Sequence, residues 1–281
     1  MQKATMPDLP ASLDLAASWI HDADALLITA GAGIGIDSGL PDFRGPQGFW
    51  GAYPGLRQPG LGFEDIANQQ AFERDPRQAW GFYGHRLQLY RSTRPHEGFG
   101  ILRELGRRMP HGVFVFTSNV DGQFEQAGFD AARMVECHGS IHHLQCLAAC
   151  STAIWSADDF HPVVDEKNCR LLSDLPVCPQ CGGLARPTIL MFDDWTWLPE
   201  RTELQQRRMA HWLQMMARLV VIEIGAGTAI PSARRKGESQ HARLIRINLR
   251  EAEVRGPQEI GIALGALDAL QALQSRVVAR T

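Results

Sequence analysis

Short apolar runs rich in β-branched side chains recur along the chain and alternate with longer, more polar stretches. The runs are 25–30 ("ALLITA"), 113–117 ("VFVFT"), 133–137 ("RMVEC"), 187–192 ("PTILMF"), 219–224 ("LVVIEI") and 244–248 ("LIRIN"). Runs with little polar interruption are typical of strands that are buried on both faces of a sheet. We therefore predict a buried strand at each of these positions.

Stretches with apolar residues at helical spacing precede several of these strands. They cover residues 7–23, 96–109 and 201–218, before the first, second and fifth runs. Helices that alternate with buried strands imply a parallel sheet covered by helices on both faces. The predicted fold class is therefore α/β, with a Rossmann-like parallel sheet whose ligands bind beyond the carboxyl ends of the strands.

Two regions interrupt this alternation. Residues 46–95 begin with many Gly, Pro, Trp and Tyr residues and then become helical, and residues 140–186 contain four cysteines in two pairs. We expect these two insertions to form a small second domain. Residues 1–45, 96–139 and 187–281 would then form the Rossmann-like domain.

The composition narrows the class of protein. The chain has 281 residues, of which 21% are charged and 44% hydrophobic, as in an ordinary globular protein. A net charge of -3 argues against nucleic acid as a partner. The N-terminal residues lack a signal-peptide pattern, and the most apolar run is far shorter than the roughly 18 to 20 residues that a membrane span needs. We expect a monomeric, cytoplasmic protein whose six cysteines are reduced and that has no membrane partner.

Four of the cysteines have the spacing of a metal site. Cys146 and Cys150 are spaced C-x3-C, and Cys178 and Cys181 are spaced C-x2-C. Two such pairs on separate loops can complete the tetrahedral sulfur shell of a structural Zn²⁺ ion. Four thiolates leave no open position for water, so this zinc would stabilise the fold and take no part in chemistry. The competing interpretation is four unrelated buried cysteines.

A glycine-rich loop follows the first predicted strand. Gly31, Gly33 and Gly35 would let the backbone approach a pyrophosphate, and the amide groups that follow would supply positive potential. The spacing departs from the dinucleotide pattern G-x-G-x-x-G, because Ile36 stands where the third glycine would be. From the spacing alone, an ordinary glycine-rich turn is an equally good interpretation.

Several motifs occur in one order along nearly the whole chain. They are "GAGIGIDSGLPDFRG" (31–45), "TSNVDGQFEQAG" (117–128), "ECHGS" (136–140), the cysteine quartet, "GAGTAIP" (225–231) and "RIN" (246–248). Together they resemble the sirtuin family of NAD-dependent protein deacylases. The resemblance implies an enzyme that uses NAD and zinc to remove acyl groups, such as acetyl, from lysine side chains of protein substrates.

The resemblance also implies roles for individual residues. His138 would be the general base that takes a proton from a ribose hydroxyl, after the acyl oxygen has attacked C1′ of the ribose and nicotinamide has left. Asn119 would share in catalysis, and the products would be free lysine and 2′-O-acyl-ADP-ribose. The implied cofactor contacts are Ala32, Gly33, Asp42, Phe43, Arg44, Ser118, Asn119, Val120, Asp121, His138, Gly225, Gly227, Thr228 and Asn248.

The chain departs from the family pattern at three places. Gly35 stands where the family usually has serine, and Ser118 where it usually has glutamine. Each change removes a side-chain hydrogen bond to the cofactor, typically worth about 0.5 to 1.5 kcal/mol. Phe192, Asp193 and Asp194 replace the usual Phe-Gly-Glu in the segment that would pair with the acyl-peptide backbone, which puts peptide docking in doubt.

One predicted helix carries residues that would select the acyl group. Tyr83 and Arg86 are spaced Y-x-x-R, and Ala67 lies sixteen residues before Tyr83. This resembles the sirtuin branch that removes succinyl and malonyl groups, in which Tyr and Arg bind the acyl carboxylate. We therefore take Ala67, Tyr83, Arg86 and Phe192 as candidate substrate residues. A core tyrosine beside an exposed helical arginine is the competing interpretation.

Two other functions remain open from the sequence. The altered peptide segment, with the cleavage residues intact, is compatible with an NAD-dependent ADP-ribosyltransferase or an NAD glycohydrolase. A catalytically inactive zinc-bearing binding module is a third possibility. The presence of Asn119, Asp121 and His138 argues against it.

Overall fold

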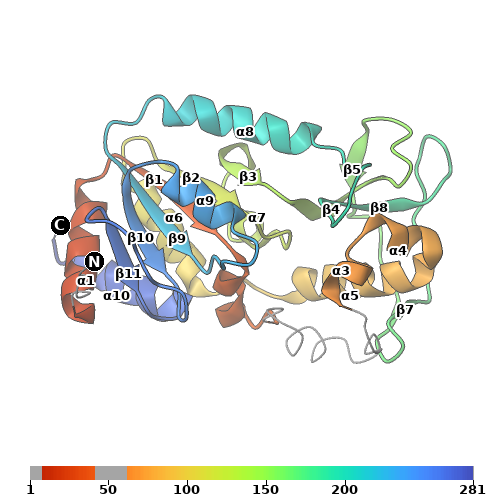
Figure 1. Ribbon diagram of the computed structural model, residues 1–281, viewed down its shortest axis with the longest axis horizontal. Helices are drawn as coiled ribbons and strands as arrows, with labels where there is room; N and C mark the ends of the chain where they lie inside the picture. The colour runs from red at the N-terminus through yellow and green to blue at the C-terminus, as the bar shows by residue number, and fades with distance from the viewer. Residues whose placement is uncertain (1–7, 42–61, 281) are drawn as a thin grey trace.

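The computed structural model describes residues 8–41 and 62–280, which form a larger α/β part and a smaller part at its side (Figure 1). The larger part is built on a six-stranded sheet with the strand order β11-β10-β9-β1-β2-β3. Every neighbouring pair in this sheet is parallel. The strands are β1 (Ala25–Ala30), β2 (Val113–Thr117), β3 (Met134–Glu136), β9 (Leu219–Ile224), β10 (Arg243–Ile247) and β11 (Glu259–Ile262).

The position of β1 decides where a ligand can bind. The chain runs outward from β1 through β2 and β3 on one side, and through β9, β10 and β11 on the other. In the register, the last residue of β1, Ala30, lies between Thr117 and Ile224. The loops that follow β1, β2 and β9 therefore leave the sheet side by side, at the point where open α/β sheets bind their ligands.

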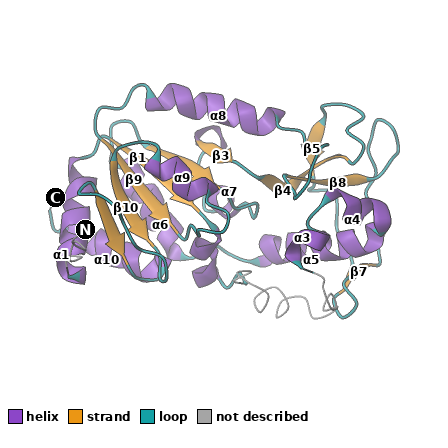
Figure 2. Cartoon of the chain, in the orientation of Figure 1, coloured by secondary structure: helices purple, strands orange, loops and turns teal. Residues whose placement is uncertain are grey.

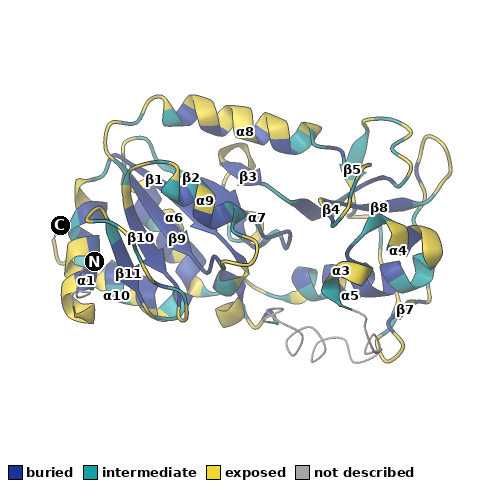
Figure 3. Cartoon of the chain, viewed as in Figure 1, coloured by how far each residue is buried: buried dark blue, intermediate teal, exposed yellow. Residues whose placement is uncertain are grey.

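Helices cover both faces of this sheet. Helices α1 (Leu9–Asp22), α6 (Glu97–Arg107) and α10 (Ala266–Val278) pack on one face, in a core with Leu26 and Ile28 of β1. Helix α8 (Glu200–Leu213) packs on the other face, in a core with Ala25 and Leu27. Alternate residues of one strand thus serve two cores, and Figure 3 shows the strands of this sheet buried over most of their length.

The smaller part combines helices with short antiparallel strands (Figure 2). Its helices are α3 (Phe63–Ile66), α4 (Gln69–Arg74) and α5 (Pro76–Ser92), and its main sheet has the order β5-β4-β8. These strands are β4 (Gly139–Cys146), β5 (Ile154–Ser156) and β8 (Ala185–Ile189), and β6 (Val164–Asp165) pairs with β7 (Arg170–Leu171). The indole of Trp80 on α5 donates to the Ala185 carbonyl at 2.9 Å, which joins helix and sheet in a separate core.

Short elements complete the described chain. They are the 3-10 helices η1 (Ala32–Ser38) and η3 (Ala131–Arg133) and the helices α7 (Gln123–Gln126) and α9 (Ser232–Glu238). Within the described ranges, none of the helices combines the length and the apolar character that crossing a membrane requires.

The sheet confirms the predicted fold class and corrects two details. The run 187–192 was expected in the parallel sheet, but its first three residues belong to β8, which pairs antiparallel with β4. A parallel partner needs a long crossover, usually a helix, and none separates this run from the cysteine pair before it. Strand β11 was not predicted, because Glu259–Ile262 is short and contains a glycine.

Candidate active site and metal centre

The loops after β1 and β9 contact each other through their backbones. The Gly31 amide donates to the Ile224 carbonyl and the Gly33 amide to the Gly225 carbonyl, both at 3.0 Å. A Cβ atom on Gly33 would lie 2.7 Å from the Cα of Gly225, which itself has a φ of 62°. Close packing of the loops therefore requires glycine at both positions. It also places Ala32, Gly33 and Gly225 together at the carboxyl end of the sheet.

The segment after β2 is hydrogen-bonded to the end of β1 and to the loop that follows it. The Ser118 amide and hydroxyl both donate to the Ala30 carbonyl, at 3.0 and 3.3 Å. The side-chain amide of Asn119 donates to the Gly31 carbonyl at 3.2 Å, and its backbone amide donates to the Thr117 hydroxyl at 3.0 Å. Asn119 is thus buried in a fixed orientation beside the glycine loop.

Asp121 follows as a buried carboxyl group. It accepts a hydrogen bond from the Gln123 amide at 2.9 Å, and its backbone carbonyl lies 2.9 Å from Nε2 of His142. Burial raises the pKa of Asp121 to about 6, although the Gln123 amide and His142 favour the ionised form. Val120, just before it, packs into the core of the smaller part, so this segment connects the two parts.

His138 lies at the exit of β3, half-buried beside the same edge. Its Nε2 is 3.1 Å from the Ser232 hydroxyl at the start of α9, and its carbonyl accepts from the Leu190 amide at 3.0 Å. Burial lowers the pKa of His138 below its ordinary value, and a hydrogen bond to the Ser118 backbone opposes this shift. The ring is therefore neutral at physiological pH and can accept a proton.

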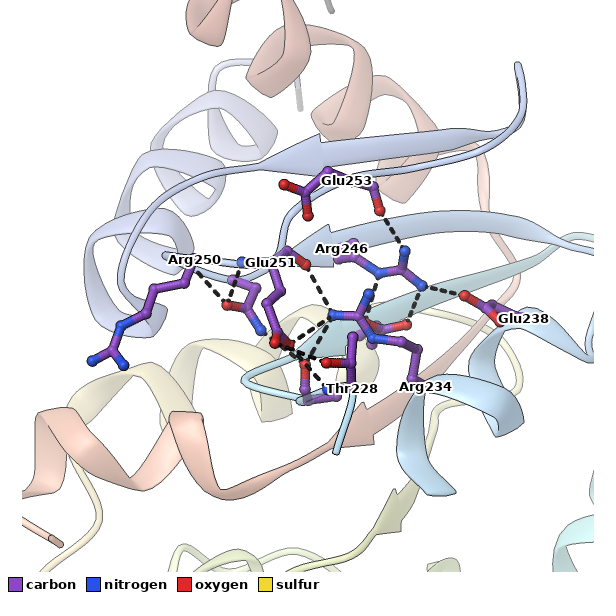
Figure 4. Close-up of polar contacts among 10 residues, drawn as sticks. Thr228, Arg234, Glu238, Arg246, Arg250, Glu251 and Glu253 are labelled. Carbon is purple, nitrogen blue, oxygen red and sulfur yellow. Dashed lines mark hydrogen bonds and ion pairs between the residues drawn. The ribbon is translucent and has the colours of Figure 1, made fainter. Parts of the chain in front are cut away.

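On the other side of the glycine loops, Thr228 and Asn248 hold the turns after β9 and β10 (Figure 4). The Thr228 amide and hydroxyl each donate to the Glu251 carboxylate at 3.0 Å. The Asn248 side chain donates to the Ala226 carbonyl at 2.8 Å and accepts from the Arg250 and Glu251 amides at 3.0 Å. Gly227 lies between these contacts in the same turn.

A buried ion network lies beside these turns (Figure 4). Arg246 on β10 faces Glu223 on β9 in the register and pairs with its two carboxylate oxygens at 2.7 and 2.9 Å. Glu238 adds a second carboxylate to Arg246 at 2.7 Å, and Arg234 of α9 donates to the carbonyls of Ala226 and Glu251 at 3.1 and 2.9 Å. The network ties the helix to both turns.

The four predicted metal ligands meet at one point in the smaller part. Their sulfur atoms all lie within 4.8 Å of one another, with 3.7 Å between Cys146 and Cys181 and between Cys150 and Cys178. A tetrahedral Zn²⁺ with bonds of about 2.3 Å requires sulfur separations of about 3.8 Å. The four residues therefore fit a zinc ion, which would have no position left for water.

The sulfur atoms of this cluster also influence one another's protonation. Hydrogen bonds that the Cys150 thiol donates to Cys181 and Cys146 raise its pKa to about 12, whereas the backbone amide of Cys181 lowers the pKa of Cys178 to about 7. Among the described residues, His138 does not belong to the metal-binding group. Sulfur alone would bind the metal, and the imidazole stays available for proton transfer.

Comparison with known proteins places the chain in a family. The family model described as "Sir2 family" matches residues 31–226. The chain belongs to the Sir2 family. Two of its relatives are the NAD-dependent protein deacylase of Pyrococcus furiosus, 32% identical over 72% of each chain, and NAD-dependent protein deacylase 2 of Pyrobaculum aerophilum. The latter is 31% identical over 86% of this chain and 84% of its own.

Solved structures agree with this assignment at the level of the fold. A mutant Sir2 homologue in complex with ADP-ribose has a TM-score of 0.70 at 24% identity and covers 95% of this chain and 96% of its own. A Sir2 homologue in complex with NAD has a TM-score of 0.69 at 24% identity, with coverages of 99% and 97%. This Sir2-family chain therefore has the family fold over nearly its full length.

The predicted substrate residues of this Sir2 protein form one cluster in the smaller part. The Phe192 amide donates to the Ala67 carbonyl at 2.9 Å, and the Phe192 ring meets Phe63 edge to face at 6.0 Å. Arg86 lies over the same Phe63 ring at 6.0 Å. Tyr83, one turn before Arg86 on α5, is 1% exposed. Segments that are distant in sequence therefore bring these positions together.

The surroundings of Arg86 overturn one interpretation. Its side chain is not exposed: Arg86 is only 8% exposed, donates to the Tyr90 hydroxyl at 3.0 and 2.6 Å, and lies 5.2 Å from the centre of the Phe82 ring. Phe63 from an earlier segment covers the guanidinium together with Phe82 and Tyr90 of its own helix, and the helical pattern alone did not reveal this burial. Tyr83 does pack in the core, and burial raises its pKa to about 12.

Residues 192–194, which depart from the family pattern, form a well-defined turn. Asp193, which stands where the family usually has glycine, has a φ of 47°, a conformation that aspartate tolerates better than most residues. Asp194 pairs with the buried Arg186 and accepts hydrogen bonds from the Met191 and Thr196 amides at 3.1 and 3.2 Å. This ion pair fixes the turn that carries Phe192.

Some site residues were predicted but cannot be placed, and others were missed. Asp42, Phe43 and Arg44 lie outside the described residues. Glu251 and Ser232 were not predicted, although they contact Thr228 and His138. No sequence pattern marks them, because each lies on a turn or helix start that only the fold brings to the site. The buried Glu223 and Arg246 had a signal, since each interrupts an apolar strand with a charge.

Proposed function

We propose that this Sir2-family protein removes acyl groups from lysine side chains of proteins in a reaction that consumes NAD⁺ and releases nicotinamide and 2′-O-acyl-ADP-ribose. The observation that carries the proposal is His138. It is a neutral, half-buried imidazole at the carboxyl edge of the parallel sheet, with Asn119 fixed beside the adjoining glycine loop. The curated relatives reported above are named NAD-dependent protein deacylases.

In this proposal, bound NAD⁺ supplies the ribose that takes up the acyl group, with nicotinamide as the leaving group. His138 removes a proton from a ribose hydroxyl through Nε2, the nitrogen that faces Ser232. Asn119 and Asp121 hold the nicotinamide end, and Asn248 and Thr228 the adenosine end. The further proposed contacts are Ala32, Gly33, Asp42, Phe43, Arg44, Ser118, Val120, Gly225 and Gly227.

We further propose that the protein accepts acidic acyl groups such as succinyl and malonyl in addition to acetyl. Arg86 is a buried guanidinium on the same helix as Tyr83, and it shares the Phe63 ring with Phe192. An arginine in an apolar setting binds a carboxylate strongly, because the surroundings screen the charge less than water does. Ala67 leaves room beside Phe192 for a longer acyl chain.

The test uses purified protein with NAD⁺ and lysine peptides that carry acetyl, malonyl, succinyl or longer acyl groups. Mass spectrometry should detect free lysine peptide and O-acyl-ADP-ribose in equal amounts. ADP-ribose formed without any peptide would instead indicate an NAD glycohydrolase, and ADP-ribose attached to protein an ADP-ribosyltransferase. The names of the relatives reported above favour neither alternative.

His138 provides the matched variant for this test. We expect His138→Ala to lower acyl transfer by about 100-fold to 10,000-fold, as for other general bases. The thermal unfolding midpoint should change little, because the ring's hydrogen bonds are few and lie at the surface of the site. His161, an exposed histidine, serves as control: His161→Ala should leave acyl transfer unchanged. Wild-type turnover by His138→Ala would refute its role.

We also propose, first, that the protein is a monomer, second, that it is located in the cytoplasm, and third, that it has no nucleic-acid partner. None of the six cysteines, all of which lie in the described residues, forms a disulfide, which supports a reducing compartment. The net charge of -3 supports the third proposal.

A further inference from the structure

One buried side chain between the glycine loop and the Asn119 segment has no polar partner in the described part of the chain. Gln123 is 1% exposed, and neither Nε2 nor Oε1 of its carboxamide has a hydrogen-bond partner among the described residues. A buried amide without partners is unfavourable, because it has lost the hydrogen bonds that water gave it. A polar side chain kept in such a place calls for a ligand or another explanation.

The position of this carboxamide is informative. Its Oε1 lies 3.5 Å from the place that a Cβ atom would occupy on Gly35 of η1. The backbone amide of Gln123 donates to the carboxylate of Asp121 at 2.9 Å. The carboxamide therefore lies where the glycine loop after β1 meets the segment after β2. This is the opposite side of the site from Asn248 and Thr228, which are proposed to hold the adenosine end.

A carboxamide has two donor hydrogens and an acceptor oxygen, so it can form two reciprocal hydrogen bonds with another primary amide. NAD⁺ carries a single primary amide, the carboxamide of its nicotinamide ring. Gly35 contributes no side chain here, and the Gln123 carboxamide fills the adjoining space.

We propose that the Gln123 carboxamide binds the nicotinamide carboxamide of NAD⁺ and takes the place of the side chain that Gly35 lacks. This inference rests on the proposed function in one respect, the use of NAD⁺. It adds a cofactor-binding residue that the sequence motifs did not indicate, and it explains why a glutamine is buried at this position.

The decisive variant is Gln123→Leu, which keeps the volume of the side chain and removes its polar atoms. A ligand-binding role predicts that the thermal unfolding midpoint without NAD⁺ stays the same or rises, because an unpaired buried amide is gone. The dissociation constant for NAD⁺ should rise by roughly 5-fold to 30-fold, as expected for the loss of one or two hydrogen bonds. The dissociation constant for ADP-ribose, which lacks nicotinamide, should not change.

Gln126→Leu is the control, because Gln126 is exposed on the same short helix. It should leave the affinities for NAD⁺ and ADP-ribose unchanged. A lower unfolding midpoint for Gln123→Leu with unchanged NAD⁺ affinity would overturn the proposal and make Gln123 a structural residue. Equal losses of NAD⁺ and ADP-ribose affinity would also overturn it, because the effect would then not come from nicotinamide.

A second variant tests the relation to Gly35. The atom closest to a Cβ there would be the terminal Cδ1 of Leu40 at 2.9 Å, a contact that a flexible side chain can relieve, and Gly35 does not need a positive φ. Adding Gly35→Ser to Gln123→Leu should recover part of the lost NAD⁺ affinity. No recovery at all would contradict the claim that Gln123 replaces a side chain at residue 35.

These binding measurements are independent of acyl transfer. Wild-type protein that binds NAD⁺ through Gln123 but converts no acyl peptide would refute the proposed function and keep the assignment of Gln123. Active wild-type protein whose NAD⁺ affinity is unaffected by Gln123→Leu would do the reverse.

Discussion

The two parts of the molecule each bury an arginine–carboxylate pair, and the two pairs do different work. In the larger part, Arg246 and Glu223 lie opposite each other on neighbouring strands of the parallel sheet, whose other strand residues are mostly apolar. In the smaller part, Arg186 on β8 pairs with Asp194 in the turn that follows the strand. The first pair supports turns at the proposed adenosine end, and the second shapes the turn that carries Phe192.

The difference shows which interactions stabilise each of the two parts. The parallel sheet has an apolar core on both faces, so its scaffold rests on hydrophobic packing and its ion network orders the loops at its edge. The smaller part has one core, short strands and four cysteines, so its shape depends more on the sulfur cluster and on Asp194. The proposed cofactor residues therefore belong mainly to the self-supporting part, and the proposed acyl-group residues to the dependent one.

Removing a metal ligand should separate the two parts most clearly. We expect Cys178→Ser to lose zinc and to unfold the smaller part, since structural zinc contributes about 10 kcal/mol or more to the folding of small metal domains. The larger part should keep its sheet. Limited proteolysis and zinc content by atomic absorption would test this, with Cys169→Ser as a control in a cysteine outside the cluster. Retained zinc and an unchanged protease pattern would show that the smaller part does not need the metal.

Breaking the ion pair of the smaller part should have the next largest effect. Asp194→Ala leaves Arg186 buried without its carboxylate, which typically costs about 3 to 5 kcal/mol. It also releases the amides of Met191 and Thr196, so the KM for acyl peptide should rise more than the KM for NAD⁺. Chemical denaturation and steady-state kinetics would measure both effects. The matched variant Glu223→Ala should raise the KM for NAD⁺ instead, and identical kinetic profiles would contradict the division between the two parts.

The segment that joins the parts should respond to pH. The pKa of Asp121 is raised in the folded protein to about 6, from an ordinary value of 3.8. Its ionisation therefore destabilises the fold as pH rises through this window. We expect Asp121→Asn to be more stable than wild type by about 3 kcal/mol above pH 7, with the difference vanishing below pH 4. Thermal unfolding of both proteins between pH 4 and pH 8 would show this. A constant difference across that range would exclude a raised pKa as its source.

The smallest expected effect concerns which acyl group the enzyme prefers. Arg86→Met should lower kcat/KM for succinyl and malonyl peptides by roughly 10-fold to 100-fold, through loss of a charged hydrogen bond, and leave acetyl peptides nearly unaffected. Arg91, on the same helix, donates to the carbonyls of Ala157 and Phe160, so Arg91→Met tests whether any arginine on α5 matters through structure alone. Equal losses on acetyl and succinyl peptides would refute a role for Arg86 in selecting acids.

The sequence predicted most strongly what local spacing encodes. Five of the six apolar runs lie in the parallel sheet, and the four spaced cysteines meet within 4.8 Å. It was wrong where partners come from elsewhere in the chain. The run 187–192 looks like any buried strand, and only the cysteine pair before it directs it to the small sheet.

Long-range contacts also explain the site residues that the sequence missed. Ser232 reaches His138 across 94 residues of chain, and Glu251 reaches Thr228 from the turn after β10. Arg86 is covered by Phe63, which precedes its helix in sequence, and by Phe82 and Tyr90 of the helix itself. A periodic pattern describes the face that a residue occupies, but not which other segment covers that face.

The direct contact between Gly33 and Gly225 affects the entropy and the rate with which a dinucleotide would bind. Because the two loops are locked together by main-chain atoms, their shape is already set when the sheet forms. Little conformational entropy at this edge is then left to lose on association. The rate of cofactor capture there should follow diffusion and electrostatic attraction, not the slow ordering of a loop.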